Sequence, residues 1–388
     1  MNRRIPAVTL AAAACLTLAA CSGTAAGSPQ PRLAAATPSS TGTATPTPSA
    51  TAPALPQSDG TLQILAFRGY AESGGKLNWV GSFEKETGCR VARLSTVQTA
   101  EEMAVQLSQR PYDVISAGPE LAGGLVADGA VQPIDTAKVT GYTDLSKRFR
   151  QLTESGGKVY GVPFLWTYGQ VLYDPAKVQD ASPARLFESD RVALRDTPLT
   201  IADAALAYKD ELGVDDPFEL TPAQLNAVMK KLAVHKDGRT YWKEPITLAK
   251  GFATGSFDLA QATPYYRLLL GKAGKPYRVL SAPATTGRVD SWMLGANVPN
   301  IDCAYRWLSW MAKPDVQRDA ASWVGMAPAS PEACKGRAKE MCAAYGAGKA
   351  DVLEKITFAV RPPGDCRPKD RECTDYATWT ERWRGLVG

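Results

Sequence analysis

The chain has 388 residues, 45% of them hydrophobic, with a formal net charge of +5 and a single histidine. A charge this small, without any run of basic residues, argues against a protein that binds nucleic acid. One histidine and no CxxC pair leave too few ligands for a zinc site, so we expect neither a metal nor a cofactor.

The first residues have the features of an export signal. Arg3 and Arg4 precede an apolar run, Ala7 to Ala20, that is too short to span a bilayer comfortably. The small residues before Cys21 resemble the lipobox of bacterial lipoproteins, which implies a signal peptide over residues 1–20 and acylation of the Cys21 thiol. The alternative is an ordinary secretory signal cut nearby. In both cases we expect the mature chain outside the cytoplasm, and with the lipid anchor at the extracytoplasmic face of the bacterial cell membrane.

Residues 21–59 are rich in proline, threonine, serine and alanine, with few large apolar side chains. Such a segment cannot bury enough apolar surface to offset its chain entropy. Its prolines favour extended conformations, which predicts a disordered, semi-stiff tether between the anchor and the folded part.

Six cysteines lie in the remaining chain, an even number that suggests three disulfides in an exported protein. Local spacing favours Cys334–Cys342 and Cys366–Cys373. That choice leaves Cys89–Cys303 as the long-range link.

Strand and helix patterns alternate over the first part of the fold. Residues 61–70 predict a buried strand, and the stretch 72–88 predicts a helix, with Trp79, Val80 and Phe83 at helical spacing and Gly88 as its stop. A second strand, a second helix and a third strand follow up to residue 118. This alternation predicts a parallel sheet with helices on both faces, in which ligands bind near the carboxyl ends of the strands. The segments "FRGY" and "ISAG" then lie on one rim.

The middle of the chain changes character. The stretch "GKVYGVPFLWTYGQVLYDP" predicts a hairpin that carries the chain from one lobe to another. Residues 200–213 predict one helix, and residues 221–236 predict another with Thr221 as N-cap and Pro222 at its first position. Residues 300–323 predict an amphipathic helix that is interrupted at "KPD".

The segment "TTGRVDSWML" concentrates chemically informative residues. In a strand, Arg288, Asp290 and Trp292 point to the same face. An aromatic ring beside a carboxylate suits an ammonium ligand, whereas an arginine beside them argues for an anion. We expect Trp292 in the core rather than in a ligand wall.

Several motifs, taken in their order, resemble the solute-binding proteins of ABC importers. They are "RGYAESG", "SFEKETGCRV", "YDVISA", "VQPID", "YGVPFLW", "IADAAL", "DSWML", "DCAYRWLSWMAKPDV" and "GMAPASPEAC". The similarity is greatest to the spermidine/putrescine (polyamine) type, in a lipoprotein branch, and it spans nearly the whole folded part.

The resemblance implies an α/β periplasmic-binding-protein-like fold of two lobes joined by a hinge, with the ligand in the cleft between them. One lobe would comprise 60–165 with 290–330, and the other 166–289 with 331–388. It also implies a monomer that binds a small-molecule solute and meets an ABC transporter permease. Such proteins perform no chemistry on the ligand, so we expect no enzyme.

The resemblance also nominates ligand-binding residues. Those that match the family's ligand-facing positions are Tyr70, Ser116, Asp196 and Asp290, whereas Phe67, Arg68, Thr263 and Arg288 occupy such positions with a different residue type. Tyr265 adjoins Thr263, and Arg361 follows a segment where the family has an aromatic residue.

These departures leave the charge of the ligand open. With Arg68 and Arg288 at the cleft, a buried ammonium meets like charges, which is unfavourable at low dielectric. Asp290 can instead pair with Arg288, so that Arg68 and Arg361 bind a carboxylate or phosphate. Under the polyamine hypothesis Asp290→Ala abolishes binding, and under the anion hypothesis it weakens binding little or strengthens it.

Two other classes of function stand beside transport. One is a binding module that has lost transport and serves sensing or protein contact. The other is an enzyme that uses Asp196 and Asp290 as acid and base. We see no nucleophile elbow and no glycine-rich phosphate loop to favour an enzyme.

Overall fold

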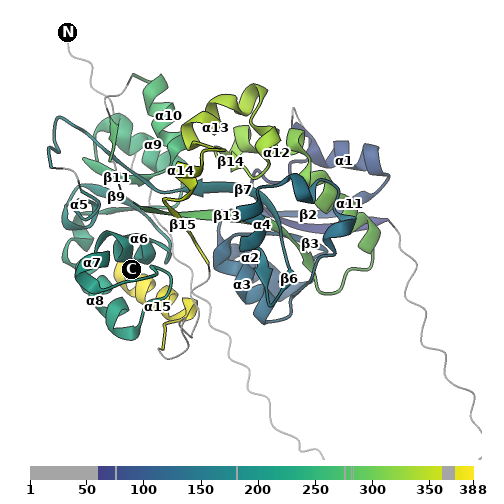
Figure 1. Cartoon of the computed structure of the whole chain (residues 1–388), viewed down its shortest axis with the longest axis horizontal. Helices are drawn as coiled ribbons and strands as arrows, with labels where there is room; N and C mark the ends of the chain where they lie inside the picture. Colours follow the sequence, from purple (N-terminus) through teal and green to yellow (C-terminus); the bar gives the residue numbers. More distant parts are fainter. Residues whose placement is uncertain are drawn as a thin grey trace, which may run out of the picture. The chain divides into compact units, whose positions relative to one another are not determined.

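The computed structural model describes residues 60–74, 77–180, 182–274, 277–280, 282, 284–360 and 372–388. The predicted signal peptide, the tether with Cys21, and Arg361 lie outside the described residues. The described part contains two sheets with helices packed around them (Figure 1). The predicted α/β class is therefore confirmed.

The first sheet has eight strands, with β14-β7-β13-β3-β1-β2 as its main path. The strands are β1 (Thr61–Phe67), β2 (Arg90–Val97), β3 (Val114–Ala117), β4 (Val131–Gln132), β7 (Val162–Tyr168), β13 (Thr285–Gly295), β14 (Ala327–Pro328) and β15 (Ile356–Phe358). β1 lies parallel to β2 and β3, as the alternating pattern predicts, whereas β13 runs antiparallel to β3 and β7. A separate two-stranded ladder joins β5 (Glu154–Ser155) and β6 (Lys158–Val159).

The second sheet has five strands in the order β10-β9-β11-β8-β12. They are β8 (Gln170–Tyr173), β9 (Val192–Arg195), β10 (Thr240–Trp242), β11 (Leu259–Ala262) and β12 (Arg278–Val279). β9 pairs parallel with β10 and β11, so the carboxyl ends of these three strands lie at one edge.

The predicted hairpin over residues 157–175 is wrong in its pairing. β7 pairs with β13 and β14 in the first sheet, while β8 pairs with β11 and β12 in the second. Only Gly169 separates the two strands, so the chain does pass from one sheet to the other, as predicted. β13 makes the return passage (Figure 1). The predicted lobe boundaries at 165/166 and 289/290 fall within β7 and β13, respectively. The assignment of segments to lobes stays a prediction.

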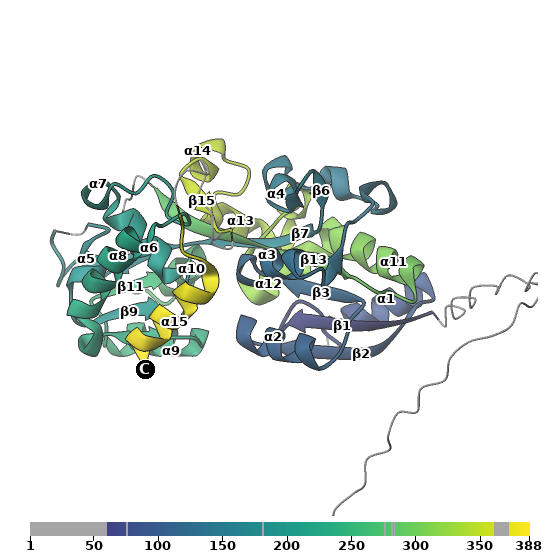
Figure 2. The same cartoon turned by 90° about the horizontal axis from the view of Figure 1, so that it is seen from below.

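Helices cover both sheets, as Figure 2 shows. The helices that precede or follow strands of the first sheet along the chain are α1 (Trp79–Thr87), α2 (Ala100–Gln109), α3 (Pro119–Ala127), α4 (Lys147–Leu152), α11 (Ile301–Ala312), α12 (Pro314–Val324), α13 (Lys339–Tyr345) and α14 (Ala350–Leu353). Those around the second sheet are α5 (Arg185–Glu188), α6 (Thr200–Ala207), α7 (Lys209–Leu212), α8 (Pro222–Val234), α9 (Pro245–Thr254), α10 (Pro264–Lys272) and α15 (Tyr376–Val387). Among the described residues, no helix has the length and apolar character needed to cross a bilayer.

Local sequence signals account for most helix ends. Gly88 ends α1 in the left-handed region, with a φ of 74°, as its lack of a Cβ allows. Thr221 and the Gln224 side chain form a capping box at the start of α8. The helix predicted over residues 200–213 is instead split into α6 and α7, because Tyr208 leaves the helical region.

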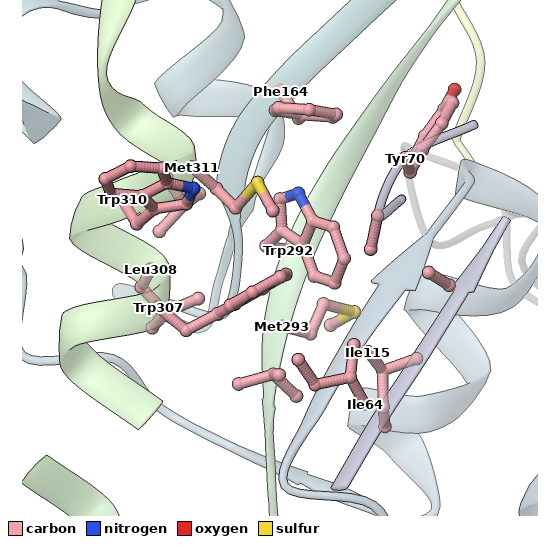
Figure 3. Packing of buried hydrophobic residues seen from close by; sticks show 14 of the residues in the cluster. Ile64, Tyr70, Ile115, Phe164, Trp292, Met293, Trp307, Leu308, Trp310 and Met311 are labelled. Carbon is pink, nitrogen blue, oxygen red and sulfur yellow. The ribbon is translucent and has the colours of Figure 1, made fainter. Parts of the chain in front are cut away.

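Aromatic packing forms the core of the first sheet (Figure 3). Trp292 is wholly buried, and its ring contacts Phe164 and Trp307 at centroid distances of 5.9 and 5.4 Å. Trp292 is thus a core residue, as predicted. The Tyr70 ring joins the same cluster through Phe164, at 5.4 Å.

Two predicted disulfides are confirmed. Cys89–Cys303 joins the segment before β2 to α11. Cys334–Cys342 links the segment before α13 to a residue within that helix. Cys373 is disulfide-bonded as well, whereas Cys366, its predicted partner, lies outside the described residues.

Candidate functional site

A small cavity of about 60 Å³ lies between the two sheets. Its polar lining includes strand residues, residues that follow strand ends and one residue of a helix, α6: Thr167, Arg195, Gln261, Thr263, Arg288 and, in the helix, Asp203. Arg195 is the last residue of β9, and Thr263 directly follows β11. The cavity therefore lies at the carboxyl ends of the strands of the second sheet, where ligands bind in open α/β sheets.

A buried charge cluster forms one side of this region. The Arg288 guanidinium pairs with Asp290 Oδ2 at 3.2 Å through Nη2 and with Glu120 Oε1 at 3.1 Å through Nη1. The Tyr70 hydroxyl donates to the same Oδ2 of Asp290 and also lies 3.2 Å from Met326 Sδ. The side chain of Arg288 is 16% exposed, that of Glu120 8% and that of Asp290 0%. The internal ion pair that the sequence suggested is thus present, with a second carboxylate added.

The environment of the cluster determines its protonation. Burial alone would lower the pKa of Arg288, but Asp290 and then Glu120 outweigh that effect and raise it. Burial raises the pKa of the Asp290 carboxyl, while Arg288 and the Tyr70 hydroxyl oppose this shift by stabilising the carboxylate. The two short ion pairs of Arg288 indicate that the guanidinium is the charged centre of the cluster.

Arg195 differs from Arg288 in having no direct ion-pair partner among the described residues, although the nearby carboxylates of Glu120, Asp290 and Asp203 favour its charged form. In the described part of the chain, no hydrogen bond or ion pair joins its guanidinium to another group. Burial and then repulsion by Arg288 lower the pKa of Arg195. Two guanidiniums therefore line the same small cavity, and in the described part of the chain only that of Arg288 is held by ion pairs.

Asp203 links the two sheets at the other side of the cavity. This residue of α6 accepts hydrogen bonds from Gln261 Nε2 of β11 and from Thr286 Oγ1 of β13. Burial raises the pKa of its carboxyl to about 6, against the hydrogen bonds and Arg195, which lower it. The Gln261 carbonyl in turn accepts the backbone N–H of Arg195 at 2.7 Å, so these side chains also fix the end of β9.

A larger cavity of about 820 Å³ lies next to the first and shares Tyr168, Gly169, Asp203 and Gln261 with it. Neither Arg195 nor Arg288 lines the larger volume. We place the candidate ligand site in the smaller cavity, because both guanidiniums line it.

The structure brings together only part of the predicted site. Tyr70, Arg288 and Asp290 are in mutual contact, and Thr263 lines the cavity with Arg288. Phe67 and Ser116 are buried in the first sheet, where the Phe67 N–H donates to Ser116 Oγ at 2.8 Å.

Three other nominated residues, all of them described, do not line the cavity. Arg68 is exposed at the end of β1. Asp196 accepts from Trp383 Nε1 at 2.7 Å and pairs with Lys243 at 3.3 Å. Tyr265 packs beside Tyr266. Arg361 lies outside the described residues.

Sequence reasoning did not nominate Glu120, Arg195 or Asp203. A signal existed for two of them. Glu120 follows the predicted rim segment "ISAG" by two residues, and Arg195 ends a short apolar run just before Asp196. Asp203 had no distinguishing signal, because an acid in the first turn of a helix is ordinary. In the described part of the chain, no group of histidine, cysteine or acidic residues has an arrangement that could hold a metal ion.

Comparison with known proteins gives consistent matches. A family model described as bacterial extracellular solute-binding protein matches residues 78–344. The spermidine/putrescine-binding periplasmic protein of Salmonella typhimurium is 24% identical over 259 residues, covering 63% of this chain and 71% of that protein.

Solved structures agree in fold. A protein from Listeria monocytogenes described as a spermidine/putrescine ABC transporter has a TM-score of 0.66 at 18% identity, covering 84% of this chain and 98% of that one. A lipoprotein of Treponema pallidum has a TM-score of 0.62 at 15% identity, with coverage of 84% and 98%. The fold and the resemblance inferred from the sequence are thereby confirmed at the level of the family.

Proposed function

Because the chain belongs to the family of bacterial extracellular solute-binding proteins, we propose that it captures a small solute between its two sheets and delivers it to an ABC permease. The family binds solutes rather than converting them, so no residue of the cluster is assigned a catalytic role.

The proposed solute carries an anionic group, a carboxylate in the first instance, that binds between Arg195 and Arg288. The observation that carries this proposal is the guanidinium of Arg195, which lines the cavity and has no hydrogen bond or ion pair among the described residues. Glu120 and Asp290 form ion pairs with Arg288, but these two carboxylates do not line the cavity. An anion between two guanidiniums removes their repulsion and can accept paired hydrogen bonds. Asp203 in the same cavity suits a cationic end, so a zwitterion fits these charges better than a dication.

A polyamine is the second candidate, because the Salmonella relative is described as binding spermidine/putrescine. Asp290, the carboxylate nominated for an ammonium group, is already paired with Arg288 and Tyr70. An incoming ammonium would have to displace that guanidinium, which is costly for a buried pair.

Binding requires the two sheets to separate. A volume of about 60 Å³ is far below the roughly 300–1,000 Å³ typical of small-molecule sites. We propose that opening occurs at Gly169 between β7 and β8 and at the start of β13, the places where the chain passes between the sheets. The predicted lobes, 60–165 with 290–330 and 166–289 with 331–388, would move as the two bodies.

We also propose that Cys21 carries a lipid anchor at the extracytoplasmic face of the membrane and that residues 21–59 act as the tether. The lipobox-like sequence before Cys21 supports this placement, as does the similarity in fold to a Treponema lipoprotein. Radiolabelled fatty acid incorporated by the wild type but not by Cys21→Ala would test it.

The solute is tested by thermal unfolding of the purified protein with succinate, glutamate, 4-aminobutyrate, inorganic phosphate, putrescine and spermidine. A ligand at a hundred times its dissociation constant adds about 2.7 kcal/mol of stability, enough to move the melting temperature measurably. We expect a response to at least one carboxylate and none to the two polyamines.

Arg195→Gln should abolish that response, because it removes the guanidinium that has no ion pair within the described part of the protein. Arg185→Gln is the matched control, since Arg185 is exposed on α5 and lines neither cavity. Undiminished binding by Arg195→Gln would remove the basis of the anion proposal, and a response to polyamines alone would favour the second candidate.

A further inference from the structure

The cluster around Arg288 has the composition of a cation site. Two carboxylates hold one guanidinium, and the Tyr70 hydroxyl donates to one of them. The four side chains come from three parts of the fold: Tyr70 after β1, Glu120 in α3, and Arg288 and Asp290 in β13. Arg288 lines the cavity, whereas the two carboxylates do not. The guanidinium therefore separates them from any solute.

The carboxylates also have unused acceptors. In the described part of the chain, Glu120 Oε2 and Asp290 Oδ1 are buried without a hydrogen-bond partner. A Cβ added at Gly118 would lie 2.5 Å from Glu120 Oε2 and 3.2 Å from Asp290 Oδ1, so the two free oxygens converge on one small volume. With one guanidinium between two carboxylates, the three side chains carry a formal net charge of −1. The two carboxylates thus suit a cation, and not an anion, at the position that the Arg288 guanidinium occupies.

We propose that Arg288 is a built-in cation that occupies a binding site for a guanidinium or ammonium group, and that its presence excludes cationic solutes from the cavity. Glu120 and Asp290 are the positioning residues that hold it there. The proposal deepens the proposed function by naming what sets the charge preference of the site. It does not need the natural solute for its test.

Removing the side chain of Arg288 leaves the site vacant. In Arg288→Ala, two buried carboxylates face a space that a guanidinium has left, and uncompensated buried charge is strongly destabilising. A small cation that enters from solution restores both ion pairs. Because it binds the folded state only, it raises the melting temperature in a saturable manner.

The test titrates Arg288→Ala with methylguanidinium, against sodium chloride at the same ionic strength. We expect the melting temperature to rise by at least about 2 °C near saturation, with no such rise in the wild type. Glu120→Gln combined with Arg288→Ala should weaken the apparent affinity at least about tenfold, since one of the two ion pairs is lost. Arg239→Ala is the matched control, because this buried arginine donates to backbone carbonyls of Leu232 and Phe187 rather than to a carboxylate.

Arg288→Lys separates folding from binding. It retains a cation in the site, so it should fold and remain insensitive to methylguanidinium. If Arg288→Ala does not fold alone, recovery of its folded state by methylguanidinium would support the proposal. No recovery, while Arg288→Lys folds, would overturn it.

The proposal would also be overturned if methylguanidinium raised the melting temperature of Arg288→Ala and of the double variant with equal affinity. An equal rise in Arg239→Ala would overturn it as well. The proposal would also be overturned if one carboxyl of the cluster became protonated in Arg288→Ala and methylguanidinium did not change the melting temperature. Failure of the carboxylate panel or of Arg195→Gln would instead count against the proposed solute, so the two failures are distinguishable.

Discussion

Replacing Asp203 by asparagine is expected to alter how stability depends on pH. The carboxyl of Asp203 has a pKa of about 6 in the folded protein, against 3.8 for an ordinary aspartate. The folded state therefore binds this proton more tightly than the unfolded state does. The stabilisation from this group is fully present below pH 3.8 and is lost as the pH rises through about 6.

The size of the effect follows from the two pKa values. A difference of roughly two pH units corresponds to about 3 kcal/mol across the whole interval, and to about 2 kcal/mol between about pH 4.5 and about pH 7.5. Asparagine preserves the geometry, because its oxygen can accept from Gln261 and its amide can donate to Thr286. Asp203→Asn should gain this amount relative to the wild type on going from the lower to the higher pH.

The assay is urea unfolding of both proteins at the two pH values. All other carboxyl groups cancel in the difference between the proteins, and Asp351→Asn, at an exposed position of α14, controls for the loss of one carboxylate. If the difference in unfolding free energy between Asp203→Asn and the wild type is the same at both pH values, the reasoning is refuted. Asp203 would then not bind its proton more tightly in the folded state.

Three further predictions concern stability. Replacing Cys89 and Cys303 by alanine should lower the free energy of unfolding by about 4–5 kcal/mol, because the bond closes a loop of 214 residues; urea unfolding with and without reductant measures it. Tyr70→Phe should cost about 1–3 kcal/mol, because the buried Asp290 carboxylate loses a donor, and a loss below about 0.5 kcal/mol would argue against that hydrogen bond. Gly325→Ala should cost more than about 1 kcal/mol in the same assay, because its φ is 79° and the new Cβ would lie 2.6 Å from a tyrosine ring; an unchanged midpoint would contradict this.

Tertiary structure also revises the chemistry inferred for single residues. Asp196 matched a ligand-facing carboxylate by resemblance, yet its oxygens are used by Trp383 and Lys243. Asp290 and Arg288 were placed on one face of a strand by period-two alternation alone, and they do form an ion pair. The alternation could not indicate Glu120, which lies 168 residues from Arg288 in sequence and accepts a second hydrogen bond from its guanidinium.

The sequence by itself determined the local elements and their order. Apolar periodicity indicated β1, α1, β2, α2 and β3, because burial of one face is the same requirement in any fold. Gly88 and the Thr221 capping box set helix ends, because both act on the backbone within one turn. Two disulfide pairs, Cys334–Cys342 and Cys89–Cys303, also followed from spacing and elimination.

Only the tertiary structure decided which strands pair and which charges meet. β7 and β8 are separated by one glycine, yet they belong to different sheets, because their backbone groups find partners far along the chain in β13 and β11. The same holds for the cavity. Arg195 and Arg288 line one cavity only after both sheets have formed, and the balance of burial and neighbouring charge that lowers the pKa of Arg195 exists only in the assembled fold.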